Sequence, residues 1–397
     1  MKVLAVNAGS SSLKFQLMNM PEEELIISGY IEKIGLKDCF WNTKVNGEKI
    51  KGERYLKNHS EAVKVLIEEL LKYHAVESLD EIDGIANRVL HGGEKYSESV
   101  IITDEVINDI KELTKLGPLH HPGNLAGIEA FKEILPDVKQ VAVFDTAFHQ
   151  TMPKENYLYP VPYEWYLRYG VRKYGFHGTS HKFITTYMKE KLGKENVNLI
   201  VCHIGSGSSI SCVKDGKCID TTMGLTPLDG LMMCTRSGSV DPSIIQYVSK
   251  ESGMDVDEIT NKLNKESGFF GLTGYSDRRD VLEGIASGDK MCELANEMFD
   301  ARVAKYIADY YIELEGKVDA IVLTAGIGEN SDQFREDIAN RLSPLGIEID
   351  KELNTKIASF KEIQEAKLST DNSKIDVYVI PTNEELMMVR DTYNLVK

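Results

Sequence analysis

The chain contains two copies of one local pattern, in which an apolar segment enters a Gly/Ser loop and a second apolar segment follows. The copies are VLAVNAGSSSLKFQL at residues 3–17 and LIVCHIGSGSSISCV at residues 199–213. Each copy predicts a β-hairpin, and their similarity predicts two related lobes in one chain. Because loop N–H groups and hydroxyls can bind phosphate, the pair favours a nucleotide phosphotransferase.

The two loops differ from the common nucleotide-binding loops. Neither matches the P-loop pattern GxxxxGK[ST] or the GxGxxG turn that opens a Rossmann helix. For either copy alone, an ordinary hairpin turn remains the alternative, because Gly and Ser are common turn residues. Two copies in matching contexts favour phosphate binding, since a plain turn gains nothing from a row of hydroxyls.

Strand-like and helix-like segments alternate along the chain, which is typical of an α/β protein. In the first part, helix-like stretches near residues 60–73 and 104–116 accompany the apolar strands DGIANRVLHGG and QVAVFDTAF. A stretch at residues 150–175, rich in proline and aromatic residues, indicates an ordered connector. The strands DAIVLTAGIGEN and KIDVYVIPTNEE follow the second hairpin, so the second lobe resembles a longer copy of the first.

The composition limits the possible partners. With 397 residues, the chain is long enough for two domains of ordinary size. Its net charge of −16 argues against binding to nucleic acid or to an anionic membrane. The six cysteines form no CxxC pair, and no signal peptide or membrane span is recognisable, so we expect reduced thiols in a cytoplasmic protein. Anionic ligands must therefore be held by a few well-placed cations.

Two arginines interrupt apolar segments and are candidates for binding an anion. Arg88 lies in ANRVLHGG, and Arg236 lies in LMMCTRSGSVDP. An arginine in apolar company needs a partner, so a structural ion pair is the alternative for each, but two of them in an acidic chain favour an anion clamp. His120 and His177 lie in the loops LHHPGN and YGFHGTSH, where capping or a surface role is the alternative.

Two acidic residues follow apolar strands, Asp145 after VAVF and Glu384 after VIPTN. The carboxyl ends of parallel strands collect Mg²⁺ ligands in open α/β sheets, which predicts that role here. Helix capping is the alternative for Glu384 and Asn383, because a helix follows directly.

The turn TAGIGEN can either cover a nucleotide or simply join a strand to a helix. His177 and His181 have i,i+4 spacing but lack the rest of a zinc pattern.

Seven segments, in order along the whole chain, together resemble the acetate kinase (acetokinase) family. They are VNAGSSSLKFQL at the start, RVLHGG, FDTAFH, YGFHGTSH, TPLDGLMMCTRSG, TAGIGEN and PTNEE. The resemblance implies two ribonuclease-H-like lobes of the actin-like ATPase fold with a nucleotide cleft between them. It places the first lobe at residues 1–149, the second, nucleotide-binding and dimerising lobe at 150–385, and a final helix at 386–397 that returns to the first lobe.

The same resemblance implies the reaction and its participants. They are reversible, direct in-line transfer of the ATP γ-phosphoryl group to acetate, giving acetyl phosphate and ADP, with Mg²⁺ as the metal and Mn²⁺ as a substitute. A cytoplasmic homodimer that takes part in acetyl-CoA formation is implied as well. A propionate or butyrate kinase, or a pyrophosphate-dependent acetate kinase, remains the alternative. A non-catalytic scaffold of the same fold would have lost its anion ligands, which remain in this chain.

The resemblance also implies roles for individual residues. Asp145, Arg88, Arg236 and His177 would be catalytic, with His177 and Arg236 stabilising the transition state, and Asn7 and Glu384 would hold the metal. Arg88, His120, Leu90, Leu119, Phe176 and Pro227 would bind acetate. Nucleotide and phosphates would be bound by Asn7, Ser10, Ser12, Lys14, His203, Gly205, Ser206, Gly207, Asp277, Arg279, Gly326, Ile327, Gly328 and Asn330.

Five positions depart from the residues usual in the family: Asn87, His121, Ser206, Cys234 and Ser239. A sixth departure, Leu90 in place of valine, adds one methylene to the predicted acetate pocket and should disfavour propionate by about 1 to 3 kcal/mol.

Overall fold

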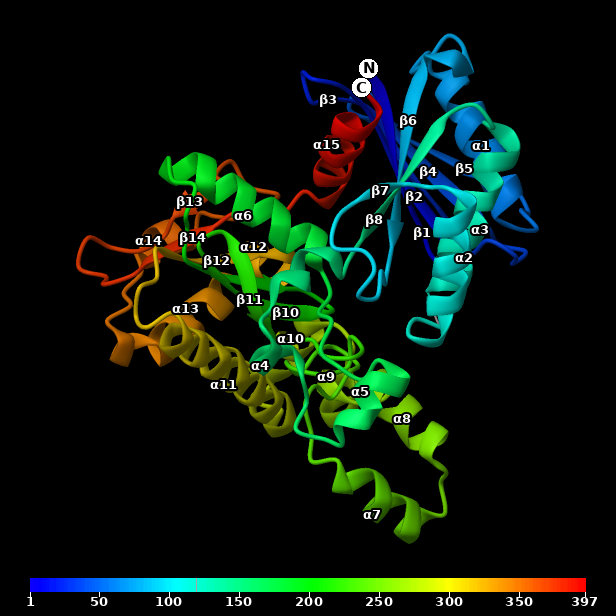
Figure 1. The fold of residues 1–397 in the computed structure, drawn as a ribbon. Coiled ribbons are helices and arrows are strands. Elements are labelled where there is room, and N and C mark those ends of the chain that lie inside the picture. The colour runs from blue at the N-terminus through cyan, green and yellow to red at the C-terminus, as the bar shows by residue number, and fades with distance from the viewer. Residues whose placement is uncertain (119) are drawn as a thin grey trace. The chain divides into compact units, whose positions relative to one another are not determined.

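Two β-sheets organise the protein, and each forms the centre of one structural unit (Figure 1). The structure is a computed structural model that describes residues 1–118 and 120–397. Unit 1 contains Met1–Gln150, Gly178–Ser180 and Asn383–Lys397; unit 2 contains Thr151–His177 and His181–Thr382. Strands and helices alternate as the sequence predicts, so the α/β assignment is confirmed.

The sheet of unit 1 has eight strands in the order β5-β4-β3-β2-β1-β6-β8-β7. Its strands are β1 (Lys2–Ala8), β2 (Ser12–Asn19), β3 (Glu24–Glu32), β4 (Phe40–Val45), β5 (Glu48–Glu53), β6 (Ile82–Val89), β7 (Val100–Ile101) and β8 (Lys139–Phe144). Its α-helices are α1 (His59–Lys72), α2 (Asp104–Glu112), α3 (His121–Ile134) and α15 (Glu384–Val396). Strand β1 pairs antiparallel with β2 and parallel with β6, so the first predicted hairpin is present.

Alternation along β1 explains why helices cover both faces of this sheet. Successive side chains of a strand point to opposite faces. Leu4 and Val6 belong to the buried cluster that includes residues of α1 and α3. Val3 and Ala5 belong to the cluster that includes Met388 and Val389 of α15. The central strand is therefore buried on both sides, and the final helix is part of unit 1.

The sheet of unit 2 has six strands in the order β11-β10-β9-β12-β14-β13. Its strands are β9 (Leu199–Ile204), β10 (Ser208–Lys214), β11 (Lys217–Thr221), β12 (Ala320–Thr324), β13 (Ala366–Lys367) and β14 (Asp376–Val379). Helices of the second half of the chain are α4 (Lys154–Tyr157), α5 (Tyr163–Tyr169), α6 (Gly178–Leu192), α7 (Ser243–Ser252), α8 (Val256–Lys265), α9 (Gly268–Thr273), α10 (Arg278–Ala286), α11 (Lys290–Glu313), α12 (Ala325–Asn330), α13 (Asp332–Arg341) and α14 (Lys351–Asn354). Strand β9 pairs antiparallel with β10 and parallel with β12, which repeats the pattern of β1, β2 and β6.

The long helix α11 supplies much of the core of unit 2. Phe299, Val303 and Ile307 of this helix share one buried cluster with Ile200 and Cys202 of β9. Asp289 caps the helix, because its carboxylate accepts hydrogen bonds from the backbone N–H groups of the first turn. Packing and capping therefore act together to fix α11 on the sheet.

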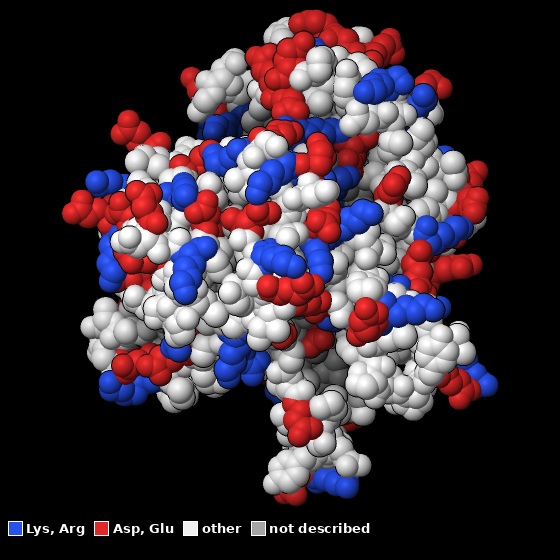
Figure 2. Space-filling view, turned by 60° about the vertical axis from the view of Figure 1, so that its left-hand side comes forward, with Lys and Arg blue, Asp and Glu red and all other residues white. Residues whose placement is uncertain are grey.

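The exposed side chains carry mixed charges. On the face in Figure 2, Lys and Arg side chains are interspersed with Asp and Glu. Many of the basic residues form exposed ion pairs, such as Lys33 with Asp38 and Arg54 with Glu68. Across residues 1–118 and 120–397, no helix is both long and apolar enough to cross a membrane.

Candidate active site

The first Gly/Ser loop is held against the start of helix α3. The Gly9 N–H donates to the Ser12 carbonyl at 2.8 Å and closes the turn. A Cβ on Gly123 would lie 2.5 Å from the Gly9 carbonyl oxygen, so only glycine permits this approach. The Asn124 side-chain amide donates to the Ala8 carbonyl at 2.8 Å, and its oxygen accepts from the Leu90 N–H at 3.2 Å. The loop is thus fixed by backbone contacts that a sequence motif does not reveal.

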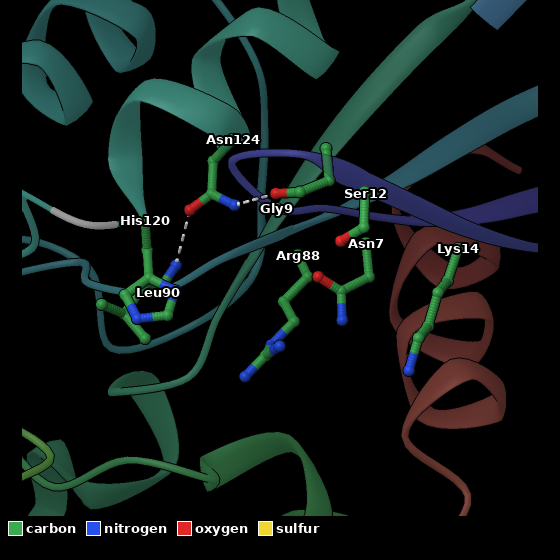
Figure 3. A pocket seen from close by; sticks show the side chains of 9 residues that line it. Asn7, Gly9, Ser12, Lys14, Arg88, Leu90, His120 and Asn124 are labelled. Carbon is green, nitrogen blue, oxygen red and sulfur yellow. Dashed lines mark hydrogen bonds between the residues drawn. The ribbon is translucent and has the colours of Figure 1, made fainter. Parts of the chain in front are cut away.

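A small cavity of about 190 Å³ lies at this loop (Figure 3). Asn7, Lys14 and Arg88 present polar side-chain ends along it (Figure 3). It is lined by Asn7, Ala8, Gly9, Ser12, Lys14, Arg88, Leu90, His120 and Asn124. The predicted residues Asn7, Ser12, Lys14, Arg88, Leu90 and His120 are therefore brought together, whereas Ser10 does not line the cavity. The arrangement suits a small anion.

Arg88 is oriented by Asp145. The two residues lie close together because β6 and β8 are parallel neighbours: Arg88 is near the end of β6, and Asp145 directly follows β8. The Arg88 Nε donates to the two carboxylate oxygens of Asp145 at 3.0 and 3.2 Å, and Nη2 donates to Oδ2 at 2.6 Å. Asp145 is fully buried, and the Arg88 side chain is 28% exposed. The Asp145 carboxylate raises the pKa of Arg88 above its ordinary value. Arg88 is therefore a fixed cation, and Asp145 serves first as its partner.

Glu384 is a half-buried carboxyl group close to other charges. Asn383 caps α15, since its side-chain oxygen accepts from the Leu386 N–H at 3.0 Å, so Glu384 is left for another role. Burial raises the pKa of Glu384 from 4.5 to about 7, and the negative charges of Asp145 and Glu385 act in the same direction. The positive charges of Arg88 and Lys14 oppose this shift only partly.

This surplus of negative charge fits a bound cation. Within residues 1–118 and 120–397, no group of three or more His, Cys, Asp or Glu residues could hold a metal ion. Mg²⁺ commonly binds with one or two protein carboxylates, water and substrate phosphates. Glu384, whose pKa is raised by burial and by the neighbouring carboxylates, fits such a ligand.

In unit 2, His177 and Arg236 converge on Gly207 in the second Gly/Ser loop. A Cβ on Gly207 would lie 3.4 Å from His177 Nε2 and 3.6 Å from Arg236 Nη1. The Arg236 Nη1 also donates to the Pro227 carbonyl at 3.2 Å, and burial lowers its pKa. The His177 ring stacks on His203, with centroids 4.2 Å apart. Two side-chain nitrogens, His177 Nε2 and Arg236 Nη1, thus face one loop.

A larger cavity of about 550 Å³ lies at the same loop and the TAGIGEN turn. Seven predicted nucleotide ligands line it: Gly205, Ser206, Asp277, Arg279, Gly326, Ile327 and Asn330. His203, Gly207 and Gly328 were predicted with them but do not line this cavity. Its volume falls within the range of small-molecule pockets, about 300–1,000 Å³, and suits a nucleoside.

Arg335 anchors the TAGIGEN turn from behind. This side chain is 1% exposed, and it donates to the carbonyls of Gly328 and Glu329 at 3.1 and 2.7 Å. It also donates to the side chain and carbonyl of Asn354 and to the Ile357 carbonyl. One buried arginine therefore fixes the wall of the nucleotide-sized cavity.

Three residues predicted for the acetate pocket, Leu90, Phe176 and Pro227, are buried or half-buried. Leu90 is buried in unit 1, and Phe176 is buried in unit 2 together with the half-buried Pro227. Leu119 lies outside the described residues. The pocket therefore stays a prediction.

The departures from the family pattern separate into two groups. Asn87 and His121 are buried, with Asn87 donating to the Gln140 side chain and His121 Nδ1 to the Ile110 carbonyl. Ser239 donates to Asp229 at 2.6 Å. Only Ser206 and Cys234 line the larger cavity.

Some residues at the two cavities were missed by the sequence analysis. Asn124 lines the small cavity, and both Asn124 and Gly123 contact the first loop; their only signal in the sequence is their place at the start of a predicted helix. Arg278 and Phe360 line the larger cavity, and no pattern in the sequence points to them.

Two sheets of the same strand pattern, each with cations beside a Gly/Ser hairpin loop, define a phosphotransferase of the actin-like ATPase fold. The comparisons then narrow the class. The chain belongs to the acetokinase family, whose model matches residues 2–390. An acetate kinase of Anoxybacillus flavithermus is 52% identical over 397 residues, covering 99% of this chain and 98% of the relative.

Two solved structures are similar over their whole length. The acetate kinase of Porphyromonas gingivalis has a TM-score of 0.94 and 41% identity, and 100% of each chain is covered. A propionate kinase of Francisella tularensis has a TM-score of 0.93 and 43% identity, and 99% of each chain is covered.

Proposed function

We propose that this protein transfers the γ-phosphoryl group of ATP reversibly to acetate, giving acetyl phosphate and ADP. The observation that carries the proposal is Arg88, held by the buried Asp145 at a small cavity beside a Gly/Ser loop. Membership of the acetokinase family supports the same reaction.

The reaction is an in-line displacement. An oxygen of the acetate carboxylate forms a bond to the γ-phosphorus, while the bond from that phosphorus to the bridging oxygen of ADP breaks. Acetate is already an anion near neutral pH, so no general base is needed. Asp145 is consistent with this, because both of its oxygens accept hydrogen bonds from Arg88. The task of the protein is to neutralise charge and to position the reactants.

Each unit supplies donors for that task. Arg88 in unit 1 would bind the acetate carboxylate, with His120 at the same cavity. Arg236 and His177 in unit 2 would donate to the oxygens of the transferring phosphoryl group. In unit 1, Glu384 and Asn7 would hold Mg²⁺ or Mn²⁺, which neutralises phosphate charge when bound.

The donor is ATP in this proposal. A cavity of about 550 Å³ beside Gly326 and Ile327 has room for a nucleoside, for which a pyrophosphate-dependent enzyme would have no use. The acceptor would be distinguished from propionate and butyrate by Leu90, Leu119, Phe176 and Pro227. Turnover on the three acids compares these alternatives directly.

We also propose a cytoplasmic homodimer. Large apolar side chains are exposed on α5, including Leu167 at 67% and Tyr169 at 62%, which supports an interface in unit 2. All six cysteines are buried and unbonded, which suits a reducing compartment. Light scattering of the purified protein tests the dimer.

Hydroxylamine trapping tests the reaction. Acetate, ATP and Mg²⁺ should yield acetyl hydroxamate with the wild type, and Arg236→Ala should lower its formation by about a hundredfold or more. Arg54→Ala is the matched control, because Arg54 pairs with Glu68 on the exposed surface. A wild type without product, or an equally active Arg236→Ala, would exclude the proposal.

A further inference from the structure

We propose that Ser209 and His181 are positioning residues that fix His177 in the tautomer with its proton on Nε2. The inference rests on the proposed role of His177 as a donor to the transferring phosphoryl group. Neither Ser209 nor His181 is among the residues to which the sequence analysis gave a role.

One buried hydroxyl contacts both imidazole rings. Ser209 lies at the start of β10, is fully buried, and pairs with His203 of β9. Its Oγ lies 2.9 Å from His177 Nδ1 and 2.8 Å from His181 Nε2. The two histidines are one helical turn apart, because the His181 N–H donates to the His177 carbonyl at 3.0 Å. The chain of contacts is therefore His181, Ser209, His177.

Counting protons and lone pairs shows which group donates in each of these two hydrogen bonds. A serine hydroxyl offers one proton and two lone pairs, and a neutral imidazole has one N–H and one lone pair. Phosphoryl oxygens only accept, so His177 Nε2 must carry a proton in order to donate to them. Nδ1 of a neutral His177 ring then has the lone pair, and it must accept the proton of the Ser209 hydroxyl. The Ser209 oxygen in turn accepts from the N–H at Nε2 of His181.

Other contacts fix the direction in which the ring points. His177 has a left-handed backbone, with φ of 56°, directly before α6. The ring stacks on His203 with an interplanar angle of 24°. Its Nε2 edge faces Gly207, the position that Arg236 Nη1 also approaches. With Nδ1 in a hydrogen bond with Ser209, the opposite nitrogen, Nε2, faces the second Gly/Ser loop.

The alternative is that Ser209 only satisfies two buried histidines. Removing the Ser209 hydroxyl distinguishes a role in setting the His177 tautomer from a purely structural role, provided that the tautomer and the kinetics are both measured. Ser211→Ala is the matched control. Ser211 is two residues along the same strand, on the same face, equally buried, and its hydroxyl bonds to Thr221 instead of a histidine.

The experiment uses the full-length protein in two readouts. Long-range ¹H–¹⁵N NMR of the histidine rings reports which nitrogen of His177 is protonated, and steady-state kinetics give kcat and KM. For the wild type we expect the Nε2–H form. Ser209→Ala should shift His177 toward the Nδ1–H form and lower kcat by about 10- to 100-fold with KM changed less than threefold, the scale seen when an orienting partner is removed. Ser211→Ala should change neither readout.

Two further variants keep the test decisive if Ser209→Ala folds poorly. Ser209→Thr retains the hydroxyl and should keep the Nε2–H form and most of the activity. His181→Gln keeps an N–H donor near the position of Nε2, so it should be at least tenfold more active than His181→Ala.

A wild-type spectrum that shows His177 protonated on Nδ1, or on both nitrogens, would overturn the inference. An Nε2–H form that survives Ser209→Ala would overturn it as well. If the wild type produces no acetyl hydroxamate, the proposed function fails, whereas the NMR comparison still decides whether Ser209 sets the tautomer.

Discussion

Replacing Glu384 with glutamine should stabilise the fold at alkaline pH and abolish the activity that needs Mg²⁺. The folded pKa of Glu384 is about 7, above its ordinary value of 4.5. A carboxyl group with a raised folded pKa stabilises the fold while it is protonated, and this contribution is lost as the pH rises through about 7. Wild-type stability should therefore fall between pH 5 and pH 8, and Glu384→Gln should remove that part of the fall.

The size of the effect follows from the shift. A folded pKa of about 7 and an unfolded pKa of 4.5 change the free energy of unfolding by about 2.5 kcal/mol between pH 5 and pH 8. At pH 8, where Glu384 is ionised, the substitution also removes a negative charge from the first turn of α15, which costs about 0.5 kcal/mol; at pH 5 the carboxyl group is protonated and there is no such cost. Relative to a side chain that stays neutral, the full shift destabilises the wild type by about 3.4 kcal/mol at pH 8, so the variant should be about 3 kcal/mol more stable than the wild type at that pH.

Urea unfolding at pH 5 and pH 8, without added metal, measures the difference. Glu385→Gln is the comparison variant, because Glu385 lies in the same first turn and acts on Glu384 only through its charge. It should give a smaller pH-dependent change. In the hydroxamate assay Glu384→Gln should be inactive at every Mg²⁺ concentration tested. An equal stability change at the two pH values would refute the assignment of the raised pKa to Glu384.

Three further predictions address the cavities. Leu90→Ala should lower the KM for propionate relative to that for acetate, and an unchanged ratio in steady-state kinetics would count against Leu90 as a wall of the acceptor pocket. Gly123→Ala should lower the free energy of unfolding by about 2 kcal/mol, because its Cβ would lie 2.5 Å from the Gly9 carbonyl oxygen; urea unfolding checks this. Arg335→Met leaves five hydrogen-bond acceptors without their donor and should lower stability by about 3 kcal/mol and raise the KM for ATP. A normal KM for ATP would show that the TAGIGEN turn holds without Arg335.

The sequence predicted the features that follow local rules. Apolar segments on both sides of the two Gly/Ser loops predicted both hairpins, and β1 with β2 and β9 with β10 confirm them. The rule that polar residues gather at the ends of parallel strands selected Asp145 and Glu384, which lie near each other in unit 1. The α/β fold class and the phosphotransferase assignment were predicted for the same reason, that each depends on motifs within short segments.

Features that depend on contacts between distant segments could not be predicted. The fork between Arg88 and Asp145 joins residues that are 57 positions apart, and the spacing alone does not indicate that Asp145 is occupied by Arg88. Ser10 resembles its neighbour Ser12 in sequence, but only Ser12 lines the cavity. Arg335 lies on an ordinary helix and has no motif, because its role is set by the carbonyl groups around it.

The position of α15 has a consequence for synthesis of the chain. The helix completes unit 1, yet it follows the whole of unit 2 in the sequence. Domains generally fold as they emerge from the ribosome, the N-terminal one first. Here the apolar face formed by Val3, Ala5 and Val141 has no helix to cover it until α15 has been made. This sheet face therefore remains uncovered throughout translation of unit 2. The helix that finally covers it also carries Glu384 at its first position.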